Sequence, residues 1–197
     1  MEAIEEELKF RSGVLSLAGV LAYPAEGEPR LALLLLAPHP HLGGRMDNNV
    51  IRHVARRAAE MGCATLRFDY RGVGDSEIDL PPGRTLYDHW SELEREQRYA
   101  DLVGDACAAC EALVRASGAP RARVVFGYSL GAILAALTAP RVGATHVVAV
   151  SPPVARVTLE PFRWLRVPKL FVAGDRDFAF DRARFVHELA RVPEPKR

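Results

Sequence analysis

The residue best placed for chemistry is a serine flanked by glycines, in the pentapeptide Gly127-Tyr128-Ser129-Leu130-Gly131. An apolar run, residues 123–126, precedes it, and a helix-prone stretch, residues 132–137, follows it. A G-x-S-x-G pattern between a strand and a helix is typical of a nucleophile elbow, a strained turn that exposes the serine hydroxyl. At the positions two residues before and two residues after the serine, only glycine fits, because the turn is crowded. The pattern predicts a nucleophilic Ser129 and therefore a serine hydrolase.

The elements that would hold this turn alternate along the chain. Helical patterns separate a series of short apolar runs, and such alternation predicts an α/β fold, a mostly parallel sheet with helices on both faces. Before it, two apolar stretches joined by Arg11-Ser12-Gly13 predict an antiparallel hairpin at the sheet edge. The expected strands are residues 6–10, 14–23, 31–38, 64–69, 123–126, 146–150 and 169–172, and the expected helices are 49–61, 98–115, 130–139 and 181–192.

Two segments do not fit this alternation. Residues 77–97 contain Pro81-Pro82-Gly83 and an aromatic cluster, and they are longer than most connections in compact α/β units. Residues 151–167 are rich in proline and aromatic side chains. Each segment either packs on the core or contacts a substrate. We expect one domain, residues 1–197, in which residues 77–97 are a candidate lid.

The charge balance restricts the kind of partner. The 197 residues carry 26 Lys and Arg against 25 Asp and Glu, a formal net charge of +1, without the basic stripe that nucleic-acid binding usually needs. The acidic N-terminus does not resemble a secretory signal, and the longest aliphatic run, residues 31–37, is too short to span a bilayer. We expect a cytoplasmic protein that acts on a small molecule, without a nucleic-acid or membrane partner.

The three cysteines are Cys63, Cys107 and Cys110, and the last two form a C-x-x-C pair. Such a pair is found in redox and metal sites. Here it lies within a helical pattern and has no second cysteine pair, so Cys107 and Cys110 share one helix face, where cysteine packs as a small apolar residue. We favour packing over redox chemistry.

Three further motifs accompany the pentapeptide. Residues 37–49 contain a His-Pro-His sequence followed by a Gly-Gly pair, residues 67–76 read Arg-Phe-Asp-Tyr-Arg-Gly-Val-Gly-Asp-Ser, and residues 174–177 read Gly-Asp-Arg-Asp. On these motifs the chain resembles the α/β-hydrolase superfamily, in particular its small bacterial members with a His-Pro-His loop. The resemblance covers nearly the whole chain and implies acyl transfer through a serine nucleophile.

The resemblance also implies an oxyanion hole, in which two N–H groups stabilise the developing negative charge. One donor is the main-chain N–H of Leu130, directly after the nucleophile. The other belongs to the His-Pro-His loop, where Pro40 is excluded because proline has no N–H. We expect His41 as this second donor, with Leu42 as the alternative. His39 is expected to shape the loop by hydrogen bonding rather than to transfer protons.

A carboxylate that orients a catalytic histidine is the next implied residue. Asp177 follows the strand-ending Gly174 with the offset found in the superfamily, at the carboxyl end of a strand, where open α/β sheets gather their sites. Asp175 is interpreted as a turn residue. Asp69 and Asp75 lie in an earlier loop and are expected to be structural, because short polar side chains favour turns.

The histidine departs from the pattern. In the superfamily the chain order is serine, acid, histidine, but the 20 residues after the expected acid contain a single histidine, His187. Its helical pattern turns it away from the apolar face, so His187 should face solvent. The positions of His53, His89 and His146 do not favour them as a catalytic base either.

Two hypotheses follow from this departure. In the first, the chain is a shortened hydrolase whose last strand, histidine loop and helix are missing, and Ser129 and Asp177 act on a small ester, thioester or amide with a histidine supplied beyond residue 197. In the second, a hydrolase-fold protein binds its ligand without catalysis. No metal-ligand cluster stands out, and Arg71-Gly72-Val73-Gly74 is too short for a phosphate loop. We therefore expect no cofactor.

Overall fold

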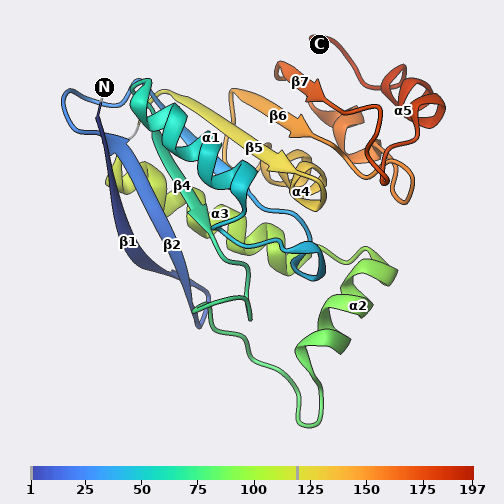
Figure 1. The fold of residues 1–197 in the computed structure, drawn as a ribbon, viewed down its shortest axis with the longest axis horizontal. Coiled ribbons are helices and arrows are strands. Elements are labelled where there is room, and N and C mark those ends of the chain that lie inside the picture. The colour runs from blue at the N-terminus through green and yellow to red at the C-terminus, as the bar shows by residue number, and fades with distance from the viewer. Residues whose placement is uncertain (1, 119) are drawn as a thin grey trace.

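A seven-stranded sheet in the order β1-β2-β4-β3-β5-β6-β7 forms the centre of the computed structural model, which describes residues 2–118 and 120–197 (Figure 1). The last five strands in this order pair in parallel. The bounds are β1 Ala3–Ser12, β2 Leu15–Pro24, β3 Leu31–Leu36, β4 Ala64–Phe68, β5 Ala122–Tyr128, β6 His146–Val150 and β7 Lys169–Val172.

The first two strands form the predicted antiparallel hairpin. Their pairing runs from Ala3 opposite Pro24 to Ser12 opposite Leu15, and Gly13 supplies the left-handed φ of 59° that the turn requires. β2 also pairs antiparallel with β4. The hairpin is therefore the edge of one continuous sheet, and the edge strand is β1.

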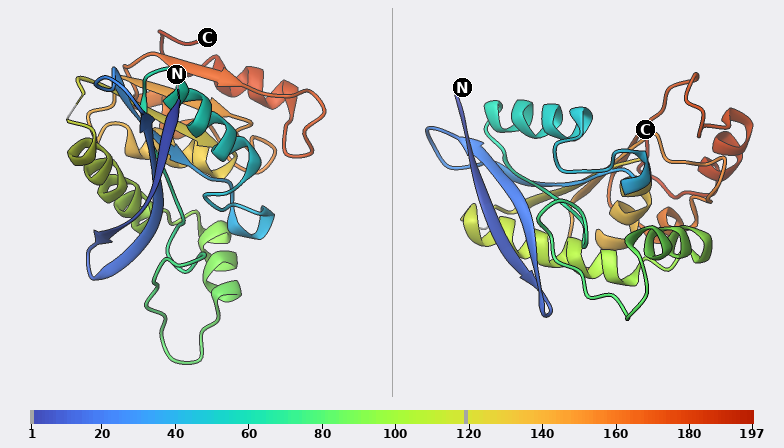
Figure 2. Two further views of the ribbon diagram at one scale, coloured as in Figure 1. Left: turned by 60° about the vertical axis from the view of Figure 1, so that its left-hand side comes forward. Right: turned by 60° about the horizontal axis from the view of Figure 1, so that its bottom comes forward.

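Helices cover both faces of the sheet. α1 lies on one face and α3 and α4 on the other (Figure 2), as the α/β prediction requires. The helices are α1 Asn49–Glu60, α2 Leu86–Glu96, α3 Ala100–Ala116, α4 Leu130–Thr138 and α5 Arg182–Leu189, with short 3₁₀ turns at Pro40–Leu42 and Glu160–Trp164. Among these residues, no helix is both long enough and apolar enough to cross a bilayer.

Helix α1 shows how the sequence specifies an element. The Asn48 side chain caps its first turn by accepting the N–H groups of Val50 and Ile51. Its buried residues, Ile51, Ala55 and Ala59, are spaced by four and share one face against the sheet.

Helix α4 is apolar around its whole circumference, and only Leu137 of its nine residues is not buried. A helix of this kind belongs in a core. It contacts β5, β6, β3, α3 and the Glu160–Trp164 turn. Its N-terminus directly follows Ser129, so the candidate nucleophile is held by one of the most buried elements of the fold.

A buried carboxylate ties the hairpin to the rest of the molecule. Asp105 of α3 is fully buried and accepts a 2.6 Å hydrogen bond from the Ser12 hydroxyl at the end of β1. Arg71, in the loop after β4, donates two bonds of 2.8 Å to the same carboxylate. Because both acidic oxygens are bonded, the buried charge is compensated.

The C-terminal residues differ in part from the sequence prediction. α5 ends at Leu189, so the helix predicted to reach residue 192 was too long. After α5 the chain returns to the edge of β7, where Lys196 pairs in parallel with Lys169. The Phe171 N–H donates to the Arg197 carbonyl at 2.8 Å.

Candidate active site

Ser129 stands at the junction of β5 and α4 with φ 55° and ψ −115°. A positive φ is unusual for a residue with a Cβ, and this ψ lies outside the left-handed helical region as well. The Ser129 N–H donates to the Val150 carbonyl of β6 at 2.9 Å, which fixes the turn to the neighbouring strand. The backbone at Ser129 therefore has the strained geometry that the pentapeptide predicts.

The flanking glycines are required by close backbone contacts. A Cβ on Gly127 would overlap the Gly131 carbonyl oxygen across the turn. A Cβ on Gly131 would overlap the Leu36 carbonyl oxygen and lie 2.7 Å from that of Ala37. The N-terminus of α4 thus packs directly on the end of β3, and this contact brings the loop after β3 beside Ser129.

Residues at the end of β4 hold that loop by its backbone. The buried Tyr70 hydroxyl donates to the Ala37 carbonyl at 2.8 Å. Met46 is held at both its main-chain groups, because its N–H donates to Asp69 Oδ1 at 2.7 Å and its carbonyl accepts from Arg67 at 3.3 Å. Burial raises the pKa of Asp69, and the Met46 N–H opposes that shift. Asp69 therefore has the structural role expected from the sequence.

The His-Pro-His loop itself closes around His39. The His39 carbonyl accepts the N–H groups of Leu42 at 2.8 Å and Gly44 at 3.1 Å. The His39 ring accepts the His41 N–H at Nδ1, at 3.2 Å. A Cβ on Gly44 would overlap the Pro38 carbonyl oxygen, so only glycine allows the loop to close this tightly. The two expected loop donors, His41 and Leu42, are thus both bonded within the loop.

A cavity of about 280 Å³ opens beside Ser129. It lies at the carboxyl ends of the parallel strands, where ligands of open α/β sheets bind. A larger cavity of about 370 Å³ is found beside Leu21, Ala64 and Pro120, at the opposite ends of the strands. The lining of the cavity at Ser129 is mostly apolar and consists of His39, Leu42, Glu94, Arg95, Gln97, Tyr99, Ser129, Leu130, Ile133, Pro153, Arg156, Val157, Phe178 and Ala179.

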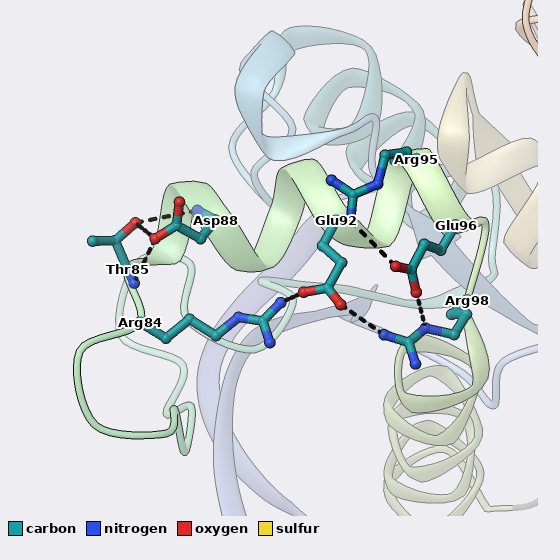
Figure 3. Close-up of polar contacts among 7 residues, drawn as sticks. All are labelled: Arg84, Thr85, Asp88, Glu92, Arg95, Glu96 and Arg98. Carbon is teal, nitrogen blue, oxygen red and sulfur yellow. Dashed lines mark hydrogen bonds and ion pairs between the residues drawn. The ribbon is translucent and has the colours of Figure 1, made fainter.

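Helix α2, in the segment considered as a lid, supplies part of this lining. Thr85 and Asp88 form a capping box at its start, and the residues flanking the helix, Arg84 and Arg98, both pair with Glu92 (Figure 3). These pairs connect α2 to its own flanking residues, so they do not attach the helix to the rest of the site. They are also weak, because their side chains are partly exposed to solvent.

The attachment of α2 to the rest of the site is largely aromatic. Trp90 is 2% exposed and packs edge-on against the His39 ring, with centroids 5.4 Å apart. Tyr87 stacks on the His41 ring at 4.9 Å. Across the cavity, Glu94 pairs with Arg156 at 2.9 Å. The helix therefore contacts the His-Pro-His loop and bridges the cavity to the chain after β6.

Asp177 lies in the turn after β7. Its carboxylate accepts the Ala179 N–H at 2.9 Å, and it is half-buried while Asp175 is exposed. The two residues that follow it, Phe178 and Ala179, line the cavity. The turn thus reaches the site from the carboxyl end of a strand, and the role of Asp177 itself stays a prediction.

The histidines divide into two groups. His41, His53, His146 and His187 are exposed, and the solvent-facing position predicted for His187 is confirmed. His89 is half-buried, and burial lowers its pKa. His39 lines the cavity, and burial lowers its pKa too.

None of these rings is bonded to the candidate nucleophile. In residues 2–118 and 120–197, the histidine rings hydrogen-bond the His41 N–H and Thr145 Oγ1, and neither bond involves Ser129.

The cysteines have the features of packed thiols. Cys63, Cys107 and Cys110 are free, and burial raises the pKa of all three, that of Cys110 to about 11. A raised pKa suppresses the reactive thiolate. This agrees with packing rather than redox chemistry for Cys107 and Cys110.

Some residues of the site carried no recognisable signal in the sequence. Glu94 and Arg156 are 62 positions apart, and each reads as an ordinary surface charge until the fold places them on opposite sides of the cavity. Trp90 belongs to the aromatic cluster of residues 87–90, which the sequence assigns neither to packing nor to substrate contact. The buried face of α2 consists of Trp90 and Leu93, three residues apart, and this spacing does not reveal that Trp90 packs on His39.

Residues 33–196 match the model of the "Alpha/beta hydrolase family". An uncharacterized protein of Rickettsia prowazekii is 29% identical over 148 residues, which are 73% of this chain and 56% of that protein. The chain thus spans little more than half the length of that relative.

Solved structures show the same fold. An α/β serine hydrolase homologue from Coxiella burnetii superposes with a TM-score of 0.76 at 24% identity, covering 97% of this chain and 84% of that one. A serine hydrolase described as lacking a lid, from Xanthomonas campestris, gives 0.77 at 21% identity over 98% and 81% of the chains. A cold-adapted esterase from an Arctic metagenomic library gives 0.76 at 18% identity over 100% and 83%.

The sheet order, the strained turn at Ser129 between β5 and α4, and these superpositions define an α/β-hydrolase fold. Since the family match extends over most of the residues, the chain belongs to the alpha/beta hydrolase family.

Proposed function

We propose that the protein is a serine hydrolase that cleaves a small ester, thioester or amide through an acyl-enzyme intermediate on Ser129. The observation that carries the proposal is the Ser129 backbone, φ 55° and ψ −115°, at the border of a largely apolar cavity of about 280 Å³. Strained residues persist where the surrounding structure holds them, and they cluster at functional sites. The serine hydrolases and the esterase among the structural relatives support the same reading.

The oxyanion would be held by two N–H groups. Leu130 is the first residue of α4, and the first N–H groups of a helix have no partner within it. In the loop, the Leu42 N–H is held by a short bond to a backbone carbonyl, whereas the His41 N–H is held by a longer bond to a side chain. His41 is therefore the loop donor that is more easily released, and we keep Leu42 as the alternative.

Asp177 would orient the catalytic histidine. Its turn after β7 reaches the cavity through Phe178 and Ala179, on the side facing α2 and the chain after β6. The general base itself is a histidine that we assign to none of the described residues, because no described histidine ring is hydrogen-bonded to the Ser129 hydroxyl.

That same observation favours a second candidate function, ligand binding without turnover. A cavity with an elbow and no base would bind an ester or its acid and leave it intact. The two functions differ in whether Ser129 reacts with an electrophile.

Fluorophosphonate labelling of the 197-residue chain, with and without added imidazole, separates them. Labelling at Ser129 without imidazole supports hydrolysis with a base present in the chain. Labelling only with imidazole supports a competent elbow and oxyanion hole that lack a base. Ser129→Ala must abolish the label, while Ser151→Ala, which alters the other strand-end serine with a positive φ, must retain it. No label in either condition contradicts the hydrolase proposal and supports binding alone.

A further inference from the structure

The His41 N–H differs from the other main-chain donors of the His-Pro-His loop because its acceptor is a side chain of the loop itself. The N–H groups of Leu42 and Gly44 donate to the His39 carbonyl, and that of Met46 donates to the Asp69 carboxylate on a different element. The acceptor for His41 is Nδ1 of the His39 ring, two residues earlier, at 3.2 Å. This distance is at the long end of the usual range for N–H donors.

The His39 ring is held in one orientation by its surroundings. It is 6% exposed and meets Trp90 at 5.4 Å and the His41 ring at 4.9 Å, both edge to face. Since Nδ1 accepts a hydrogen bond, the proton of the neutral ring is on Nε2, which is buried.

The charged groups around the ring act in both directions. Burial lowers the pKa of His39, the Glu94 carboxylate and the Trp90 main chain oppose this shift, and the positive charges of His41 and Arg156 reinforce it. The ring is therefore neutral at neutral pH, and its Nδ1 is free to accept.

We propose that His39 is a positioning residue for the His41 N–H. Its Nδ1 accepts a hydrogen bond from this N–H in the unliganded protein, and the N–H then transfers its hydrogen bond to the negatively charged oxygen that forms at Ser129. The inference rests on the proposed function, because it takes Ser129 and His41 in the roles given above. No covalent bond changes in the exchange, since one acceptor replaces another on the same N–H.

The exchange favours the transition state over the bound substrate. A neutral ester carbonyl competes with a neutral ring nitrogen on nearly equal terms, whereas a hydrogen bond to an oxyanion is roughly twice as strong as a neutral one. The His41 N–H therefore transfers when the oxygen becomes charged. Interactions that strengthen only at that point accelerate the reaction, whereas uniform binding does not.

Helix α2 takes part in this arrangement. Trp90 fixes the ring of His39, and Tyr87 stacks on the ring of His41 at 4.9 Å. Because α2 contacts both histidines, its packing sets how firmly Nδ1 holds the N–H.

Amide NMR of the 197-residue chain tests the hydrogen bond between the His41 N–H and His39 Nδ1 directly and does not require turnover. The background is His41→Gln, which keeps the main-chain N–H and removes the second imidazole ring beside His39. Within it, His39, His39→Asn and His39→Ala are compared. Asparagine at this position retains a side-chain acceptor of the kind that caps helical turns, and it does not titrate in this range.

The expected result is a downfield residue-41 amide proton with His39 or His39→Asn above pH 6.5, and an upfield shift with His39→Ala. On acidification, a further upfield shift occurs only with His39, as the ring gains a proton at Nδ1. An amide that does not move while the His39 ring titrates overturns the proposal. If His39→Ala does not fold, the comparison between His39 and His39→Asn decides the question alone.

A second measurement links the exchange to the reaction. In protein labelled by a fluorophosphonate, the phosphonyl oxygen on Ser129 takes the N–H, so the residue-41 amide should lose its dependence on the protonation of His39. Continued titration of that amide in the labelled protein overturns the proposal. Failure of Ser129 to label refutes the proposed function instead, and the amide titration of the unlabelled chain still decides whether His39 holds the N–H.

Discussion

The strain at Ser129 predicts that the nucleophile makes the protein less stable than it would be with glycine at the same position. Ser129→Ala removes the hydroxyl and keeps the Cβ, so the unfavourable φ of 55° and ψ of −115° remain. Ser129→Gly removes the Cβ and with it the steric cause of the strain. The comparison of these two variants isolates the backbone energy from the loss of the hydroxyl.

The magnitude follows from two opposing terms. A residue held in such a conformation costs about 1–3 kcal/mol, and glycine recovers this. Against it, glycine loses more conformational freedom on folding, at about 0.5–1 kcal/mol relative to alanine. The free energy of unfolding of Ser129→Gly should therefore exceed that of Ser129→Ala by about 1 kcal/mol. For a chain of this size that difference raises the melting temperature by roughly 2–4 °C.

Urea denaturation and calorimetry of both variants provide the measurement. Two other serines provide matched controls: Ser151, with φ 43°, should show the same sign, and Ser117, with φ −102°, should show the opposite sign. If Ser129→Gly is no more stable than Ser129→Ala while Ser151 and Ser117 behave as expected, the elbow carries no strain, and the observation on which the proposed function rests is wrong.

Four further variants test the fold around the site. Gly131→Ala should lower the free energy of unfolding by about 2 kcal/mol, because its Cβ would overlap a β3 carbonyl oxygen. Gly104→Ala, the control on α3 where the added Cβ meets open space, should raise the free energy of unfolding by about 1 kcal/mol. Urea denaturation measures both changes. Asp105→Ala should cost about 3 kcal/mol, because it leaves the Arg71 guanidinium without its main partner, and a loss below about 1 kcal/mol would show that the network is not structural. The lowered pKa of His39 means that the unfolded chain binds this proton more tightly, so the free energy of unfolding should fall as the pH drops from 6.5 toward the folded-state pKa. The slope from one such group is at most about 1.4 kcal/mol per pH unit, and His39→Asn should reduce it in a pH series of melting curves.

The elbow was predictable because its constraint is local. The G-x-S-x-G pattern indicates that a Cβ two residues before or after Ser129 would overlap the backbone of the turn. The structure shows such overlaps with backbone carbonyl oxygens at Gly127 and Gly131. The strands were predictable for a similar reason, since runs such as Leu31–Leu36 are apolar on both sides of the pleat and have no place on a surface.

The hydrogen bonds inside the His-Pro-His loop were not predictable from the residue types. The sequence excludes Pro40 as a donor but does not distinguish His41 from Leu42. Only the folded loop shows that the Leu42 N–H meets a carbonyl and the His41 N–H meets a ring nitrogen. The backbone conformation of the His-Pro-His loop depends on contacts with β4 and α2, which lie far away in the sequence.

By itself, the sequence of this protein determined the α/β class, the N-terminal hairpin, the strained turn at Ser129 and the placement of His187 toward solvent. Each of these depends on side-chain size and spacing within a few residues. The tertiary structure alone decided that Trp90 packs on His39, that Glu94 meets Arg156 across the cavity, and that His39 holds the His41 N–H. Periodicity reveals which side chains are buried, but partners brought together from separate elements follow only from the three-dimensional packing of the whole chain.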